Sequence, residues 1–170
     1  MILTTCAACA APLPRLAKQC SRCKTRYCGA ACQAQHWKEG GHDKRCKKIR
    51  KGGGAEQSHA DKKYKEVVAV AVEACTEDTN GQKCYLCLEA VHSRTGEGLV
   101  RGCACGDRDG VSSPELGVVH VSCLARQAKI AYEGDVGMPS TWNDWYICRL
   151  CEQQYHGVVA CALGWACWKT

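Results

Sequence analysis

Residues 6–46 read CAACAAPLPRLAKQCSRCKTRYCGAACQAQHWKEGGHDKRC. Eight of the Cys and His residues in this stretch fall into close pairs, which are Cys6–Cys9, Cys20–Cys23, Cys28–Cys32 and His42–Cys46. A close pair supplies two ligands from one turn, and a second pair completes the tetrahedron that Zn²⁺ prefers. Four pairs therefore predict two zinc ions in this stretch.

A second array of the same kind follows downstream. Its pairs are Cys84–Cys87, Cys103–Cys105, His120–Cys123 and Cys148–Cys151. By the same argument it predicts two more zinc ions, so we expect four Zn²⁺ in the whole chain. Stretches as short as these rarely bury enough apolar surface to fold unaided, and structural zinc supplies the missing stability.

The abundance of cysteine also fits a secreted disulfide scaffold, since 17 of the 170 residues are Cys. An odd cysteine count and histidines at ligand positions favour metal instead. The first residues, MILTTCAACAAP, have neither the charged nor the apolar region of a signal peptide. We therefore expect a reducing intracellular compartment, either nucleus or cytoplasm.

Charge is unevenly distributed along the chain. Residues 1–51 carry twelve Lys and Arg against two acids, while the remainder carries eleven against fifteen. Zinc-bound thiolates add negative charge to both arrays, which brings the expected net charge of the holo protein close to zero. The formal charge of +6 is therefore a poor guide, and general affinity for nucleic acid is not expected.

Between the arrays, residues 44–51 form a basic run that Gly52–Gly54 ends. We interpret this run as the solvated end of a helix rather than a nuclear localisation patch. Residues 61–75 predict a helix, because their apolar side chains recur with helical spacing. This stripe consists of Tyr64, Val67, Val68, Ala71, Val72 and Cys75.

Three further elements are expected in the second half. A helix should start right after His120, and residues 106–117 should form a loop, since they are rich in Gly, Asp and Ser. Residues 158–168 are apolar but much shorter than the ~20 residues of a membrane span. We expect a core or capping helix there and no membrane partner.

The first array resembles a MYND-type zinc finger in more than its spacing. Tyr27 precedes Cys28, Gln33 follows Cys32, and Trp37 lies four residues after Gln33. The resemblance implies that the two sites interleave, with one zinc on Cys6, Cys9, Cys28 and Cys32 and the other on Cys20, Cys23, His42 and Cys46. The four-residue steps Cys28–Cys32 and His42–Cys46 would each suit one helical face. His36 is then expected to pack or lie on the surface, since eight ligands satisfy two ions.

MYND fingers bind short proline-containing peptides of other proteins. By the resemblance, Gln33 and Trp37 match positions that line the peptide groove. An exposed indole offers a flat face to a proline ring, and a Gln can bond an extended backbone. The alternative is that Trp37 only seals the small core over a zinc. MYND fingers also occur in SET-type lysine methyltransferases, but this chain has no recognisable cofactor-binding segment for that domain.

The second array looks like a RING-CH-type finger. Cys103 and Cys105 are separated by a single residue, and His120-Val-Ser-Cys123-Leu is similar to a segment of that family. The resemblance implies a cross-brace, with Cys84, Cys87, His120 and Cys123 on one zinc and Cys103, Cys105, Cys148 and Cys151 on the other. RING-CH fingers are commonly ubiquitin ligases that dock a conjugating enzyme, and Leu86 would belong to that docking surface.

Two departures weaken the ligase interpretation. The family usually has a Trp near the position of Gln127, and the stretch between Cys105 and His120 is longer than usual. Losing an aromatic anchor removes much of the energy of a modest interface. Trp142, Trp145 and Tyr146 precede Cys148 and either cover a zinc or face a partner. An aromatic there is also typical of PHD fingers, so a chromatin reader stays open as a weaker alternative.

We therefore expect a small zinc-stabilised α+β fold with two cross-braced modules joined by a linker and a short helix. The predicted limits are residues 1–50 for the MYND-type finger, 51–80 for the Gly-rich linker and helix, and 81–170 for the RING-CH-like finger with its apolar helix. The favoured function is a protein–protein interaction adaptor without catalytic residues. The alternative is a RING-type ubiquitin ligase whose MYND finger selects the substrate, with a conjugating enzyme as partner.

Overall fold

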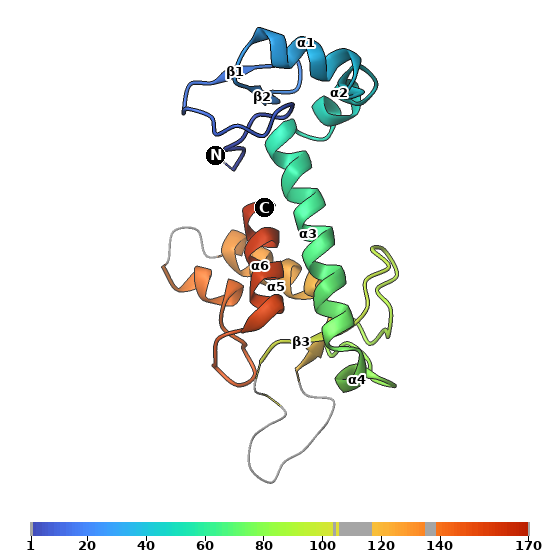
Figure 1. Cartoon of the computed structure of the whole chain (residues 1–170). Coiled ribbons are helices and arrows are strands. Elements are labelled where there is room, and N and C mark those ends of the chain that lie inside the picture. The colour runs from blue at the N-terminus through green and yellow to red at the C-terminus, as the bar shows by residue number, and fades with distance from the viewer. Residues whose placement is uncertain (1, 104, 106–116, 135–138, 170) are drawn as a thin grey trace. The chain divides into compact units, whose positions relative to one another are not determined.

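A computed structural model describes residues 2–103, 105, 117–134 and 139–169 (Figure 1). The chain divides into two compact units, Met1–Lys62 and Lys63–Thr170. Both consist of very short strands, helices and turns around Cys/His clusters, so the prediction of a small zinc-stabilised α+β fold with two interleaved modules is confirmed. The limits at residues 50 and 80 stay a prediction.

The first unit contains one two-stranded sheet and two helices of its own. Strand β1 (Lys18–Gln19) pairs antiparallel with β2 (Arg26–Tyr27), and α1 (Ala30–Lys38) and α2 (His42–Lys51) follow. Its buried apolar cluster consists of Cys6, Cys20, Cys23, Tyr27 and Cys46. Four of these five residues are predicted metal ligands, so Tyr27 is the one buried member of this cluster that is not a ligand.

Helix α3 runs from Ala55 to Ala74 and continues from the first unit into the second. It begins at Ala55 and not at residue 61, because the strong helix formers Ala55 and Glu56 extend it beyond the apolar stripe. The stripe itself is confirmed: Tyr64, Val68, Ala71 and Cys75 are buried, and Val67 and Val72 pack against the same core. The predicted short helix is therefore a long one.

The second unit arranges its helices around a second small sheet. Strand β3 (Val100–Arg101) pairs antiparallel with β4 (Val118–Val119). The remaining elements are α4 (Thr76–Thr79), α5 (Val121–Gly134), the 3₁₀ helix η1 (Pro139–Trp145) and α6 (Gly157–Lys169). Helix α5 starts directly after His120 and α6 covers the apolar run, as predicted. The predicted loop at 106–117 lies outside the described residues except for Gly117.

The core of the second unit is larger and mostly aliphatic. Helix α6 contributes Val159, Ala162, Leu163 and Ala166, all buried. Within the described part of the chain, no helix has both the length and the apolar character needed to cross a membrane. The apolar run of α6 is thus a core helix, as the sequence indicated.

A polar contact ties three segments of this core together. The Tyr64 hydroxyl on α3 donates to Oε1 of Glu97 at 2.9 Å, and the other oxygen of Glu97 accepts the Ser122 backbone N–H of α5 at 3.0 Å. The Lys169 ammonium at the end of α6 lies 4.3 Å from the centre of the Tyr64 ring. Nothing in the sequence pattern pointed to Glu97, because its partners are distant along the chain.

Candidate metal centres

The same backbone turn occurs at all four C-x-x-C pairs. In each turn the residue after the second Cys donates its N–H to the carbonyl of the first Cys, and the first Cys donates to a carbonyl five residues on. That following residue has a left-handed backbone in every case: Ala10, Lys24, Leu88 and Glu152, with φ between 59° and 64°. The turn leaves both sulfurs on one side, which is what a pair of ligands to one ion requires.

A fifth turn in the chain has the same hydrogen bonds without the cysteines. His92 donates its backbone N–H to the Glu97 carbonyl, and Gly96, with φ of 70°, donates to the His92 carbonyl. His92 and Thr95 stand where a C-x-x-C pair has its sulfurs, and the Thr95 N–H donates to the His92 ring at 3.2 Å. This loop therefore has the backbone hydrogen bonds of the four C-x-x-C turns, and a hydrogen bond between its own residues stabilises it.

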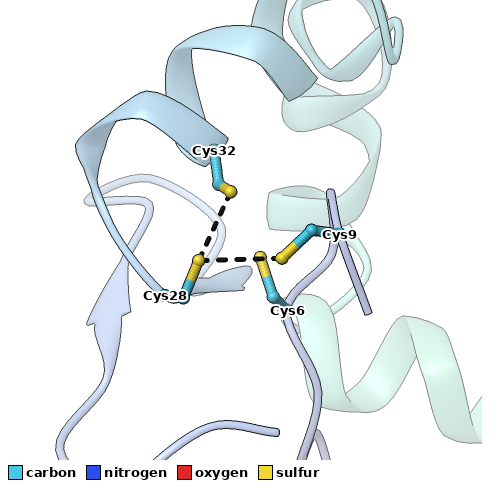
Figure 2. A group of neighbouring side chains, drawn as sticks. All are labelled: Cys6, Cys9, Cys28 and Cys32. Atoms are coloured by element: carbon cyan, nitrogen blue, oxygen red, sulfur yellow. Dashed lines mark hydrogen bonds between the residues drawn. The ribbon is translucent and has the colours of Figure 1, made fainter. Parts of the chain in front are cut away.

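The ligands gather into four tetrads. These are Cys6, Cys9, Cys28 and Cys32 (Figure 2); Cys20, Cys23, His42 and Cys46; Cys84, Cys87, His120 and Cys123; and Cys103, Cys105, Cys148 and Cys151. In each tetrad the ligand atoms all lie within 4.8 Å of one another. The tetrads interleave along the sequence in both modules, in the pairing that the two family resemblances implied.

The distances fit zinc. Two sulfurs bound tetrahedrally at 2.3 Å from one ion would lie about 3.8 Å apart, and a sulfur and a nitrogen about 3.6 Å apart. Sulfur–sulfur separations in the tetrads include 3.7 Å for Cys9–Cys28 and 3.8 Å for Cys20–Cys46. The His42 Nε2 lies 3.4 Å from the Cys23 sulfur. The four tetrads are thus consistent with four Zn²⁺ ions.

The acidity of the thiols is compatible with a bound cation in each tetrad. Burial opposes ionisation of Cys6, but the backbone N–H groups of Cys9, Cys28 and Ala8 outweigh it and lower its pKa to about 6. In the same tetrad the contact with Cys28 raises the pKa of Cys32 to about 12. A tetrad alone thus holds one thiolate readily and resists the next, and a divalent cation removes that resistance.

The fully cysteine-ligated centre of the second module follows the same rule. The contact with Cys103 lowers the pKa of Cys148 to about 4, despite burial and with help from the backbone N–H groups of Cys151 and Leu150. Burial raises the pKa of Cys105 to about 12. Gly117 closes against this centre with φ of 84°, and a Cβ there would lie 3.0 Å from the Cys103 sulfur.

The two histidine ligands are positioned differently. In the second module the His120 Nε2 lies 3.4 Å from the Ala90 carbonyl, while its Nδ1 lies 3.3 Å from the Cys87 sulfur. A carbonyl partner on one ring nitrogen leaves the other as the metal ligand. Burial lowers the pKa of His120 and of His42, which keeps both rings neutral as ligands must be.

In the first module, aromatic and imidazole rings position the His42 side chain, whereas in the second module a backbone carbonyl positions His120. Tyr27, His36 and Trp37 all pack against the His42 ring, with centroids 6.2, 5.1 and 5.6 Å away. The Tyr27 hydroxyl also lies 3.0 Å from Nδ1 of His36. His36 is therefore a packing residue and belongs to none of the four tetrads, as expected.

The four centres differ in their exposure to solvent. In the Cys6 tetrad, Cys9 and Cys28 are exposed, whereas Cys20, Cys23, His42 and Cys46 are all buried. One sequence expectation needs correction here. Cys28 does not share a helical face with Cys32, because α1 begins only at Ala30 and Cys28 lies in the segment before it. His42 and Cys46 do share a face, since both belong to α2.

The three remaining cysteines belong to none of these tetrads. Cys75 is buried at the end of the α3 stripe, and its thiol donates to the Arg101 carbonyl at 3.5 Å. Cys161 is exposed on α6 and Cys167 is half-buried there. All seventeen cysteines lie among the described residues, and none forms a disulfide there.

The candidate peptide-binding residues of the first module lie together on α1. A shallow hollow of about 290 Å³ is lined by Gln33 and Trp37 with Ala30, Ala34 and Lys38. Trp37 contacts His42 yet keeps 36% of its surface exposed. Sealing the core and facing a partner are thus compatible roles for this residue.

In the second module Leu86 lines a separate groove of about 360 Å³. Gln127 and Ile130 of α5 and Arg149 beside the last ligand pair line it as well. The aromatic residues before Cys148 differ in burial. Trp145 is buried in the core, while Trp142 is 50% exposed and stacks edge-on against Tyr132.

Comparison with known proteins agrees with the first module. The profile of the MYND finger family matches residues 6–46. No curated protein and no solved structure matches the chain significantly. Because the matched residues coincide with the first two tetrads, residues 6–46 are a MYND finger, and residues 84–151 form a further Cys/His module whose type the comparisons leave unassigned.

Proposed function

We propose that this protein is an adaptor whose MYND finger binds a proline-containing peptide of a partner protein. MYND fingers are zinc-binding modules that bind proteins, and zinc serves here to shape the surface rather than to perform chemistry. The second module would then bind a second partner. We place the protein in the nucleus or cytoplasm, because zinc-binding cysteines need a reducing compartment.

The observation that carries this proposal is the hollow on α1. Trp37 presents part of its indole face there, Gln33 lies one helical turn earlier on the same side, and both line the same depression. A rigid aromatic face suits a proline ring, and a neighbouring amide can bond the backbone of an extended peptide. The packing of the Trp37 ring on His42 restricts the side chain before binding, which reduces the entropy lost when a peptide binds.

The test is a screen of proline-containing peptides against the zinc-loaded chain, read by fluorescence anisotropy. Trp37→Ala should reduce the affinity for a peptide found in this screen about ten-fold, which corresponds to about 1.4 kcal/mol. Because Trp37 also packs on a ligand, the zinc content of this variant must be measured by native mass spectrometry.

Gln33→Ala should weaken the same peptide with Zn²⁺ unchanged. Gln35→Ala is the matched control, since Gln35 is exposed on the same helix but bonds to Glu39 and lies outside the hollow. Equal losses from the two Gln variants would contradict the proposed site.

A ubiquitin ligase is the second candidate, and the groove beside Leu86 favours it. Leu86 is 38% exposed and Ile130 is 58% exposed, so two apolar side chains are available in one groove between the Cys84–Cys87 turn and α5. A conjugating enzyme would need such an apolar anchor point. Gln127 lines the same groove where the RING-CH family usually has a Trp, so any docking here should be weak.

The ligase candidate is tested by a ubiquitination assay with a panel of conjugating enzymes. Activity should be lost with Cys87→Ser plus Cys123→Ser, reduced by Leu86→Ala and raised by Gln127→Trp. Val91→Ala serves as control, because Val91 is exposed in the same module but outside the groove. If both the native chain and Gln127→Trp are inactive with four zincs bound, the ligase candidate is excluded and the adaptor proposal remains.

A further inference from the structure

A second pocket of the first unit differs in chemistry from the hollow on α1. It has a volume of about 460 Å³ and lies between the extended segment 2–5, helix α2 and the first two turns of α3. Its lining includes the cations Arg26, Arg45 and Lys62. His36, His42 and His59 line it as well, and no Asp or Glu side chain is among the lining residues.

Two of the cations are held in place by neutral groups. The buried Arg26 guanidinium donates to the carbonyl oxygens of Leu3, Pro14 and Arg15. The Arg45 guanidinium donates to the carbonyls of Gly40 and Gly41. Carbonyl acceptors orient these two guanidinium groups without carrying a full negative charge, so these contacts leave their positive charge in place.

The charge of the surrounding unit acts in the same direction. Residues 1–62 carry thirteen Lys and Arg against four Asp and Glu. The two zinc centres of this unit would add about −3, which leaves it strongly cationic. An anion approaching the pocket is therefore attracted both locally and at longer range.

The rest of the lining distinguishes between anionic ligands. Ile2, Leu3, Ile49 and Ala55 provide an apolar part, and Thr4 and Thr5 provide hydroxyls. No Trp or Tyr lines the pocket, so it has no such platform for stacking nucleic acid bases. The volume exceeds that of a single small anion and lies within the usual range for ligand pockets.

We propose that this pocket binds a short acidic peptide segment of a partner protein, with a Glu or Asp carboxylate near Lys62 and Arg45 and an apolar neighbour against Ile49. The site adds charge selection to the adaptor and rests on the proposed function only in that the ligand is a protein. It is separate from Gln33 and Trp37, which line the other hollow.

The experiment measures binding of a labelled peptide of alternating Glu and Leu to the zinc-loaded full chain by fluorescence anisotropy. We expect it to bind at least ten-fold more tightly than a peptide of alternating Gln and Leu. Lys62→Glu should reduce the affinity for the acidic peptide at least ten-fold, with four zincs retained in native mass spectra.

Lys47→Glu is the matched control. Lys47 is an exposed cation of α2 outside the pocket, so its reversal changes net charge equally and should cost less than three-fold. Gln33→Ala should leave this binding unchanged, which separates failure of this site from failure of the proline-peptide site.

Three results would overturn the proposal. Equal losses from Lys62→Glu and Lys47→Glu would show attraction to net charge alone. Displacement of the peptide by an equal concentration of inorganic phosphate would reduce the pocket to a general anion site. Tighter, Lys62-dependent binding of single-stranded RNA would assign the pocket to nucleic acid.

Discussion

The two zinc modules solve the problem of a small core in different ways. In the first, the buried apolar cluster consists of four zinc ligands and Tyr27. In the second, three helices supply an aliphatic core that surrounds the ligands, including Val68 of α3, Leu124 of α5 and Leu163 of α6. The first module therefore depends on its zinc ions for a core, whereas the second module has an aliphatic core in addition to its zinc sites.

Zinc removal should produce the largest difference in unfolding between the two modules. Each structural zinc contributes roughly 10–16 kcal/mol of apparent binding free energy in model peptides, so a chelator should unfold residues 6–46 completely. Helices α3, α5 and α6 should keep partial protection, because their apolar contacts remain. Peptide-resolved hydrogen exchange during chelation measures this. Full deuteration of both modules at the same chelator concentration would contradict the comparison.

The order of zinc release sharpens the same contrast. The Cys6 tetrad should lose its ion first, since Cys9 and Cys28 are exposed to the chelator and the other tetrads are more buried. Differential alkylation should then label Cys9 and Cys28 before Cys20 and Cys23. Acid should release zinc as well, because protons compete for the thiolates and imidazoles, so stability falls with falling pH.

Gly117→Ala should damage only the second module. A new Cβ would lie 2.9 Å from Cys105 Cβ and 3.0 Å from the Cys103 sulfur, at a backbone φ of 84°. We expect loss of one zinc in native mass spectra and a destabilisation of about 3 kcal/mol.

Gly81→Ala is the control for backbone strain alone. Gly81 has a similar φ of 73°, but nothing lies within 4 Å of its added Cβ. This variant should keep four zincs and lose about 1 kcal/mol. Zinc loss from both variants would show that the close approach at Gly117 is not decisive.

Tyr64→Phe should weaken the polar contact within the second core. Removing the hydroxyl leaves the Glu97 carboxylate with one partner fewer, which should lower the free energy of unfolding by about 2 kcal/mol. Urea denaturation of the zinc-loaded protein measures it. Tyr132→Phe, at an exposed position of α5, should change stability little. A similar effect of the two variants would remove the role assigned to Glu97.

Ala10→Gly should give the smallest effect and the opposite sign. Ala10 holds φ of 59° in the first zinc turn, where Gly is not strained, so the variant should gain about 1 kcal/mol. Ala8→Gly, within the same turn but without a positive φ, should lose a fraction of that amount. Thermal denaturation of the zinc-loaded chain compares them, and a loss in both would argue against strain at Ala10.

The local features of this protein could be predicted from the spacing of its residues. Ligand pairs such as Cys6–Cys9 lie within one turn, and the stripe from Tyr64 to Cys75 lies on one helix face, so their spacing reports their geometry directly. The MYND finger was recognisable for the same reason, because Gln33 and Trp37 follow its ligands at short range. The start of α3 was missed because Ala55 and Glu56 favour a helix without contributing to a stripe.

Contacts between residues far apart in the sequence could not be predicted from spacing, because they depend on packing. The Ala90 carbonyl at His120, the Glu97 carboxylate between Tyr64 and Ser122, and the basic pocket around Lys62 join segments that have no common sequence pattern. The exposure of Cys9 and Cys28 is of this kind too, since burial depends on what packs against a residue and not on its spacing. Residue spacing specifies the local turns and helices of the chain, whereas packing determines which side chains are exposed to solvent and whether they are charged.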